Sequence, residues 1–365
     1  MAAMTKAPPV LARVYRGSHV ESVHRGCLAV VDEKGRLLEG CGDPDLPVYA
    51  RSAAKPFQAM PLLLAGGEKQ FDLGDAEIAL MCASHGGEPR HVQLARRILR
   101  RGGFRPDDLR CGAHSPMHEA SARELVRRGE KPTALHNNCS GKHAGLLLAC
   151  RALGLSHADY TDPGHALQRR IRALVARYAD IPESWITVAV DGCNLPVFRL
   201  PLSALARAYA RLVAGRLPGE EPCAAAVRAR IVRALTKQPD LVAGTGRFTT
   251  DFIQAGRGRW IGKEGAEGVY CVGLRAAARG GKAIGIAFKI EDGSARPRDA
   301  VTLSVLDRLG ALPIELRRAL ASYAEPPVHN ALGVEVGRIE ADVPIAPGGH
   351  GKPAARRARL GEAIR

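Results

Sequence analysis

Helix-type and strand-type apolar patterns alternate along almost the whole chain, and this alternation restricts the fold more than any other feature of the sequence. Two apolar runs at residues 26–32 and 36–40, separated by Glu33-Lys34-Gly35, predict a β-hairpin. Further strands are predicted at residues 186–191, 268–274, 283–290 and 333–339. Helical spacing predicts helices at residues 52–65, 119–128, 144–153, 166–178 and 201–213. The prediction is an α/β fold.

No linker divides this pattern. Composition does not shift along the chain, and no repeat or low-complexity segment interrupts it. With 46% hydrophobic and 25% charged residues, the composition is that of a soluble globular protein with a sizeable core. We therefore predict a single domain over residues 1–347. Residues 348–365, Gly-rich and then Arg-rich, are predicted to be a basic, mobile tail.

Apolar runs are too short for a membrane protein. A spanning helix needs roughly 18 apolar residues, and the longest candidate, residues 145–155, contains Arg151. Residues 1–9 contain one lysine and no apolar stretch long enough for a secretory signal. We expect no membrane association and a cytoplasmic location.

The strong positive charge raises the question of nucleic-acid binding. The formal net charge is +16 and the isoelectric point is near 9.8, values that suit a nucleic-acid partner. The cations are, however, spread over predicted helix faces and the tail. Aromatic residues make up only 4% of the chain and do not interleave with a basic stretch, as stacking on single strands would require. We expect no nucleic-acid partner.

A serine and a lysine stand three residues apart where a helix is predicted to begin. Ser52 is a candidate N-cap, and Ser52 and Lys55 should project from the same helix face. A serine nucleophile with a lysine base can hydrolyse an amide through an acyl-enzyme, and this is the S-x-x-K arrangement of penicillin-recognising enzymes. The alternative is an N-cap serine beside a surface lysine.

A second serine–lysine pair strengthens this interpretation. Lys263-Glu264-Gly265 resembles the K-T-G strand of penicillin-recognising enzymes, with Glu in place of Thr. Ser84 lies in a small-residue turn, which could also be structural only. A lysine acts as a base only when neutral. If Lys55 and Lys263 share a pocket, each disfavours the protonated form of the other.

Cysteine and histidine suggest a metal site. Nine cysteines are scattered through the chain, so a disulfide framework is not expected. Cys139 lies in a polar stretch before an apolar helix, and Cys193 follows a predicted strand. The two thiols could share a zinc ion, with His136 or His143 as a third ligand by ordinary preference. The alternative is two buried cysteines and no metal.

Several stretches together resemble one family, the rhizobial-type L-asparaginases. The match covers roughly residues 10–345, and the segment around Cys139 is distinctive. The stretches that carry it are residues 15–25, 51–56, 82–87, 136–145, 191–196 and 263–268.

The resemblance implies an α/β (α+β) fold related to serine β-lactamases and penicillin-binding proteins, with a central antiparallel sheet flanked by helices, assembled as a homodimer. It also implies two catalytic serine–lysine pairs, which fall here on Ser52 with Lys55 and on Ser84 with Lys263. Ser52 is the preferred nucleophile.

For the metal, the resemblance implies a zinc ion near the active site, held by two cysteines and a lysine. These match Cys139, Lys142 and Cys193, so the lysine replaces the histidine that ligand preference alone favours.

The expected reaction is hydrolysis of L-asparagine to L-aspartate and ammonia. An amino-acid substrate needs a carboxylate for its ammonium and a cation for its carboxylate, so Arg51, Asp191 and Glu267 are candidate binding residues, or else structural ion pairs. The nearest rival is a serine–lysine or β-lactamase-like hydrolase of another amide. A basic nucleic-acid-binding protein is the rival of a different class.

Overall fold

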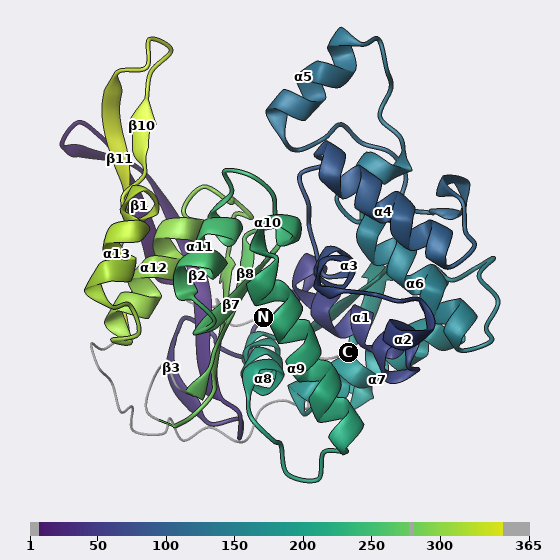
Figure 1. The fold of residues 1–365 in the computed structure, drawn as a ribbon. Helices are drawn as coiled ribbons and strands as arrows, with labels where there is room; N and C mark the ends of the chain where they lie inside the picture. The colour runs from purple at the N-terminus through teal and green to yellow at the C-terminus, as the bar shows by residue number, and fades with distance from the viewer. Residues whose placement is uncertain (1–6, 277–280, 346–365) are drawn as a thin grey trace, which may run out of the picture.

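An antiparallel sheet forms the main layer of the protein (Figure 1). The computed structural model describes residues 7–276 and 281–345, so the predicted tail at 348–365 lies outside the described residues. In the described part the sheet has eight strands, in the order β10-β11-β1-β2-β9-β8-β7, with β3 paired to β2. They are β1 (Val10–Arg16), β2 (His19–Asp32), β3 (Leu37–Cys41), β7 (Trp260–Gly265), β8 (Val269–Leu274), β9 (Ile284–Ile290), β10 (Pro327–His329) and β11 (Glu335–Ala341).

The long strand β2 joins the two halves of this sheet. Its first half pairs with β1, and its second half pairs with β9 and β3. The register shifts between Val14 and Tyr15 of β1, and such irregularities increase the local twist. The sheet consequently curls.

A smaller sheet positions two segments of the candidate site. Its strands, in the order β4-β6-β5, are β4 (Pro47–Tyr49), β6 (Pro196–Pro201) and β5 (Thr187–Val190). Tyr49 pairs with Arg199, and Val190 pairs with Pro196. The chain therefore leaves β4 towards residue 51 and leaves β5 towards residue 191, both of them predicted binding positions.

Helices occupy the rest of the chain. The α-helices are α1 (Lys55–Leu64), α2 (Gly67–Gln70), α3 (Asp75–Met81), α4 (Pro89–Arg101), α5 (Glu119–Arg127), α6 (Ser140–Ala152), α7 (Ala166–Ala179), α8 (Leu202–Val213), α9 (Pro222–Lys237), α10 (Pro239–Val242), α11 (Phe248–Gly256), α12 (Arg298–Arg308), α13 (Ile314–Ala319) and α14 (Ala321–Ala324). The 3₁₀ turns are η1 (Arg51–Ala54), η2 (Pro106–Asp108), η3 (Ala134–His136) and η4 (Glu183–Trp185). In Figure 1, α2, α4 and α6 lie away from the β10–β11 end of the sheet.

Glycines let α8 lie directly on the sheet. Gly273 and Gly285 are cross-strand partners in β8 and β9. A Cβ added at Gly285 would lie 1.7 Å from the carbonyl oxygen of Ala206 in α8, so no larger residue fits there. On the other face, Tyr270 packs against Phe252 of α11 and under Arg298 of α12. The sheet is thus covered on both faces.

Helix α1 is buried on every side. From Lys55 to Leu63 each of its residues is buried, and it packs against α6, α7 and α9. A helix surrounded by protein carries apolar residues all round, as this one does except at its first turn. Pro56 lies in that first turn, where its missing N–H costs nothing.

Most predicted elements are confirmed, with shifted ends. The hairpin is β2–β3, and the predicted helices correspond to α1, α5, α6, α7 and α8. Ser52 as an N-cap is wrong: it lies inside η1, where its carbonyl accepts a hydrogen bond from the N–H of Lys55, and the residue before α1 is Ala54. An i→i+3 bond tightens this turn into a 3₁₀ helix before the α-helix begins. The relation to serine β-lactamases stays a prediction.

Candidate active site

Three buried side chains from distant parts of the chain meet at one hydroxyl group. Lys55 begins α1, Ser84 lies in the loop after α3, and Lys263 lies in β7. The Nζ atoms of Lys55 and Lys263 lie 3.0 and 2.7 Å from Oγ of Ser84. No more than 3% of any of these residues is exposed. The structure therefore brings together three of the four predicted catalytic residues, and both lysines contact the same serine.

The loop that carries Ser84 is held from several directions. The N–H of Ser84 donates to the carbonyl of Val242 at 2.9 Å, and Nη1 of Arg247 donates to the carbonyl of Ser84 at 3.0 Å. Nζ of Lys55 also donates to the carbonyl of Ala83 at 2.5 Å. These bonds fix the hydroxyl relative to both lysines, the kind of support that a reactive geometry requires.

The environment of Lys263 favours a neutral amine. Burial is the largest cause that lowers its pKa, and the positive charge of Lys55 acts in the same direction. Together they lower the pKa of Lys263 to about 7. The expected effect of two lysines in one pocket is therefore confirmed for Lys263, which can accept a proton near neutral pH.

Ser52 is more exposed than the three residues of this cluster. It is partly exposed, whereas Ser84 is buried. In a 3₁₀ turn, residues three apart project from the same side, so Ser52 and Lys55 share a face as predicted. The residue before it, Arg51, has a φ of +48°, an uncommon conformation for a residue with a side chain and one that clusters at functional sites. The chain thus turns sharply to present Ser52.

Glu264 replaces the threonine of the K-T-G pattern, and it is held by two arginines. Its carboxylate lies 2.5 Å from Arg247 and 2.8 Å from Arg298. Burial alone would raise its pKa, but Arg247 and the other nearby cations lower it below the usual value. Arg247 therefore links this carboxylate to the Ser84 loop. We did not anticipate this arginine, because nothing in the residues next to it in sequence marks it.

Two thiols and a lysine form a second buried cluster. Cys139 precedes α6, Lys142 lies in its first turn, and Cys193 lies in the turn after β5. Nζ of Lys142 is 3.0 Å from Sγ of Cys193. A hydrogen bond from Cys193 lowers the pKa of Cys139 well below its usual value, and Lys142 adds to this effect. The three predicted zinc ligands are therefore in contact with one another.

The histidines considered as ligands have other partners. Nδ1 of His136 accepts from the N–H of Thr133 at 3.0 Å, and Nδ1 of His143 lies 2.7 Å from Oη of Tyr160. Within the described ranges, no three side chains of His, Cys, Asp or Glu gather where they could hold a metal ion.

The three candidate binding residues also lie together. Nε of Arg51 is 2.8 Å from Oδ1 of Asp191, and its Nη1 is 4.0 Å from Oε1 of Glu267. Glu267 has a φ of +61°, and the N–H of Gly192 donates to Oδ1 of Asp191. Arg51 adjoins Ser52, so this charged group lies beside the predicted nucleophile. It carries both signs of charge, as recognition of an amino acid requires.

Comparison with protein families assigns the chain. The model described as L-asparaginase II matches residues 12–341. The chain belongs to the L-asparaginase II family. Its resemblance to L-asparaginases is thereby confirmed, and a comparison with curated proteins finds no match.

Membership of the L-asparaginase II family supports an amidohydrolase. Every candidate site residue, from Arg51 to Glu267, lies within the matched span. No helix in the described part of this family member is long and apolar enough to cross a membrane.

Proposed function

We propose that this protein is an L-asparaginase that hydrolyses L-asparagine to L-aspartate and ammonia through a serine–lysine acyl-enzyme. The observation that carries the proposal is the Ser84 hydroxyl held between Lys55 and Lys263, in a chain of the L-asparaginase II family. Nucleophilic catalysis needs a hydroxyl, a base and a group that returns the proton to the leaving amine. In this proposal Ser52 supplies the hydroxyl, and the Lys55–Ser84–Lys263 arrangement accepts and returns the proton.

Ser52 is the proposed nucleophile, because it is partly exposed while Ser84 is buried. Oγ of Ser52 bonds to the side-chain amide carbon of asparagine. Its proton passes to Lys55 as Lys55 gives a proton to Ser84 and Ser84 gives one to Lys263. The net transfer is one proton from Ser52 to Lys263, which must be neutral at the start.

The remaining steps reverse this transfer. The carbon–nitrogen bond breaks, and the leaving nitrogen receives the proton from Lys263 through the same chain, so that ammonia departs. Water then attacks the ester carbon and gives a proton to the same relay. The bond between that carbon and Oγ of Ser52 breaks, Oγ takes the proton back from the relay, and aspartate is released. In this scheme Arg51 binds the α-carboxylate, and Asp191 and Glu267 bind the ammonium.

Zinc is a further part of the proposal. The donor set fits the metal, because zinc prefers thiolate and nitrogen ligands, and the hydrogen bond from Cys193 lowers the pKa of the Cys139 thiol well below its usual value. Burial alone would lower the pKa of Lys142, but the Cys139 and Cys193 sulfurs raise it, so binding would have to displace a proton from Lys142. When bound there, zinc would supply a positive charge able to polarise a carbonyl.

The test is ammonia release from L-asparagine by the wild type and by Ser52→Ala, Ser84→Ala and the control Ser322→Ala, an exposed serine in α14. We expect wild-type activity in the control. We expect a loss of at least 10⁴-fold for Ser52→Ala, the order found when a nucleophile is removed. Turnover of a chromogenic β-lactam without turnover of asparagine would contradict the proposed substrate.

The nucleophile is identified separately. Wild-type protein is treated with an electrophilic asparagine analogue, and mass spectrometry locates the label. A label on Ser52 supports the scheme, and a label on Ser84 contradicts it. Zinc content measured for the wild type and Cys139→Ala tests the metal. The homodimer and the cytoplasmic location belong to the same proposal, and sedimentation tests the first.

A further inference from the structure

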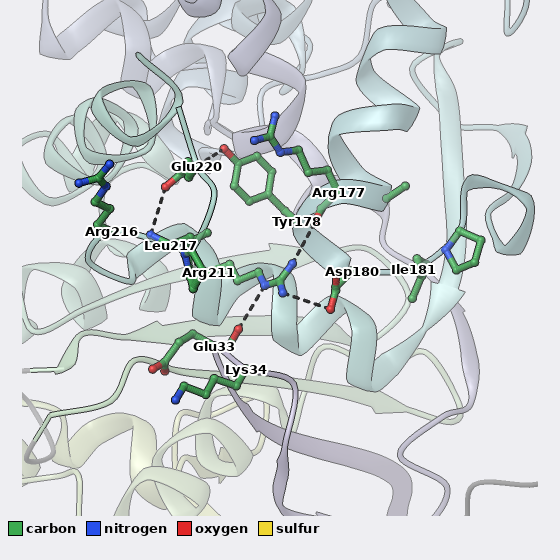
Figure 2. Close-up of a pocket in the computed structure, with 13 residues that line it drawn as sticks. Glu33, Lys34, Arg177, Tyr178, Asp180, Ile181, Arg211, Arg216, Leu217 and Glu220 are labelled. Atoms are coloured by element: carbon green, nitrogen blue, oxygen red, sulfur yellow. Dashed lines mark hydrogen bonds and ion pairs between the residues drawn. The ribbon is translucent and has the colours of Figure 1, made fainter. Parts of the chain in front are cut away.

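A cavity of about 740 Å³ lies apart from the catalytic cluster. It is bounded by the β2–β3 turn, the C-terminal end of α7, Arg211 of α8, and residues 216–220 after α8 (Figure 2). None of its lining residues belongs to the serine–lysine, thiol or Arg51 groups. Its volume is in the range of small-molecule sites, roughly 300 to 1,000 Å³.

Some of the charges around this cavity already have partners. Arg211 pairs with Asp180 at 3.1 Å and donates from Nε to the carbonyl of Glu33 at 3.1 Å. Glu220 is neutralised by the buried Arg228, whose Nη2 lies 2.5 Å from it. These paired side chains form part of the cavity wall, and their charges are already neutralised.

Four other charged groups have no such partner. The side chains of Lys34, Arg177 and Arg216 make no hydrogen bond or ion pair within the described residues. Oε2 of Glu33 is buried and also lacks a hydrogen-bond partner there. Figure 2 shows Glu33 and Arg177 on opposite sides of Arg211, with Arg216 to one side. The cavity therefore offers three cations and one carboxylate.

We propose that this cavity binds a small acidic amino acid, with two carboxylates and one ammonium. A buried carboxylate oxygen without a partner is costly and calls for a donor, and the ligand's ammonium would supply one to Glu33. The two carboxylates would be held by Arg177, Arg216 and Lys34, since arginine binds carboxylates through paired donors. L-Aspartate has this set of charges.

The cavity lies next to the catalytic helix. Tyr178 lines it, and the Tyr178 ring also packs against Phe57 of α1 at 5.8 Å. Phe57 in turn packs against Tyr209, whose hydroxyl donates to the carbonyl of Ala53 at 2.7 Å. A bound ligand would thus contact Tyr178, which is linked through Phe57 and Tyr209 to Ala53, the residue after Ser52. The statement that this ligand is also the reaction product rests on the proposed function. The chemical class of the ligand rests only on the charged groups that line the cavity.

The first test counts L-aspartate sites by isothermal titration calorimetry. We expect the double variant Arg177→Ala/Arg216→Ala to bind one equivalent fewer per chain than the wild type, or to bind it at least 10-fold more weakly. The matched control is Arg170→Ala/Arg259→Ala, which removes two exposed arginines outside the cavity. Unchanged stoichiometry and affinity in the first variant would overturn the proposal.

The second test concerns the ammonium. The wild type should bind L-aspartate at this site at least 10-fold more tightly than succinate, which lacks the ammonium, and Glu33→Gln should abolish the preference. A preference that survives in Glu33→Gln would overturn the assignment. Melting temperatures of all variants verify that they fold, and Arg216→Ala alone replaces the double variant if it does not. Because binding is measured without turnover, absent asparaginase activity would not affect either result.

Discussion

The charge of Lys55 should determine when Lys263 becomes protonated. Both Nζ atoms lie within 3.0 Å of Oγ of Ser84, so they are no more than about 6 Å apart. At an effective dielectric constant of about 20, two unit charges at about 6 Å repel by about 2.8 kcal/mol, or about 2 pKa units. Replacing Lys55 by methionine removes this repulsion and keeps the volume. We therefore expect Lys55→Met to raise the pKa of Lys263 by about 2 units.

The assay is an NMR titration of the lysine side chains labelled at Cε, with Lys263 assigned from Lys263→Met. In the wild type its resonance should titrate with a pKa of about 7, and kcat/KM should rise with pH through the same range, since only the neutral amine accepts a proton. In Lys55→Met the titration should move upward. A wild-type Lys263 that titrates near the ordinary lysine pKa of about 10.4 would refute the reasoning. So would a Lys263 pKa that is the same in the wild type and in Lys55→Met.

Three further predictions concern stability and support of the site. Glu220→Ala should cost roughly 3–5 kcal/mol of unfolding free energy in urea, because it leaves Arg228 buried and unpaired; a loss below about 1 kcal/mol would contradict this. Gly285→Ala should lower the melting temperature by pushing α8 away from the sheet, at a cost of about 1–3 kcal/mol, and an unchanged melting temperature would show that α8 can shift freely. Arg247→Met should lower kcat by roughly 10- to 150-fold, since a hydrogen bond to a charged group is worth roughly 1.5–3 kcal/mol; steady-state kinetics with unchanged kcat would show that Arg247 does not support the Ser84 loop.

Short-range features of the site were predictable from sequence because local geometry decides them. The shared face of Ser52 and Lys55 follows from their spacing of three residues, whichever helical form the turn takes. The α1 boundary was less predictable. A serine before an apolar run indicates an N-cap, but the turn closes as a 3₁₀ helix around it, through a backbone bond that involves no side chain.

The thiol cluster shows how far pattern and ligand preference extend. Cys139 and Cys193 were identified from their surroundings, yet ordinary preference favoured a histidine between them. The family resemblance pointed to Lys142 instead. In the structure that lysine contacts Cys193 while His143 turns to Tyr160. The direction of each side chain around α6 decides this choice, and that direction depends on what packs against the helix.

The sequence by itself determined the mixed α/β class, the β2–β3 hairpin, the serine–lysine spacing and the residues that mark the family, because each depends on local periodicity or on motifs that can be read along the chain. Only the tertiary structure decided that Ser84 lies between two lysines, one of them 179 residues away, and that Arg247 supports the Ser84 loop. Those contacts depend on the order of strands in the sheet and on how η1, which leads into α1, packs beside β7. Burial there also lowers the pKa of Lys263, because desolvation is a property of the folded surroundings and not of the residue.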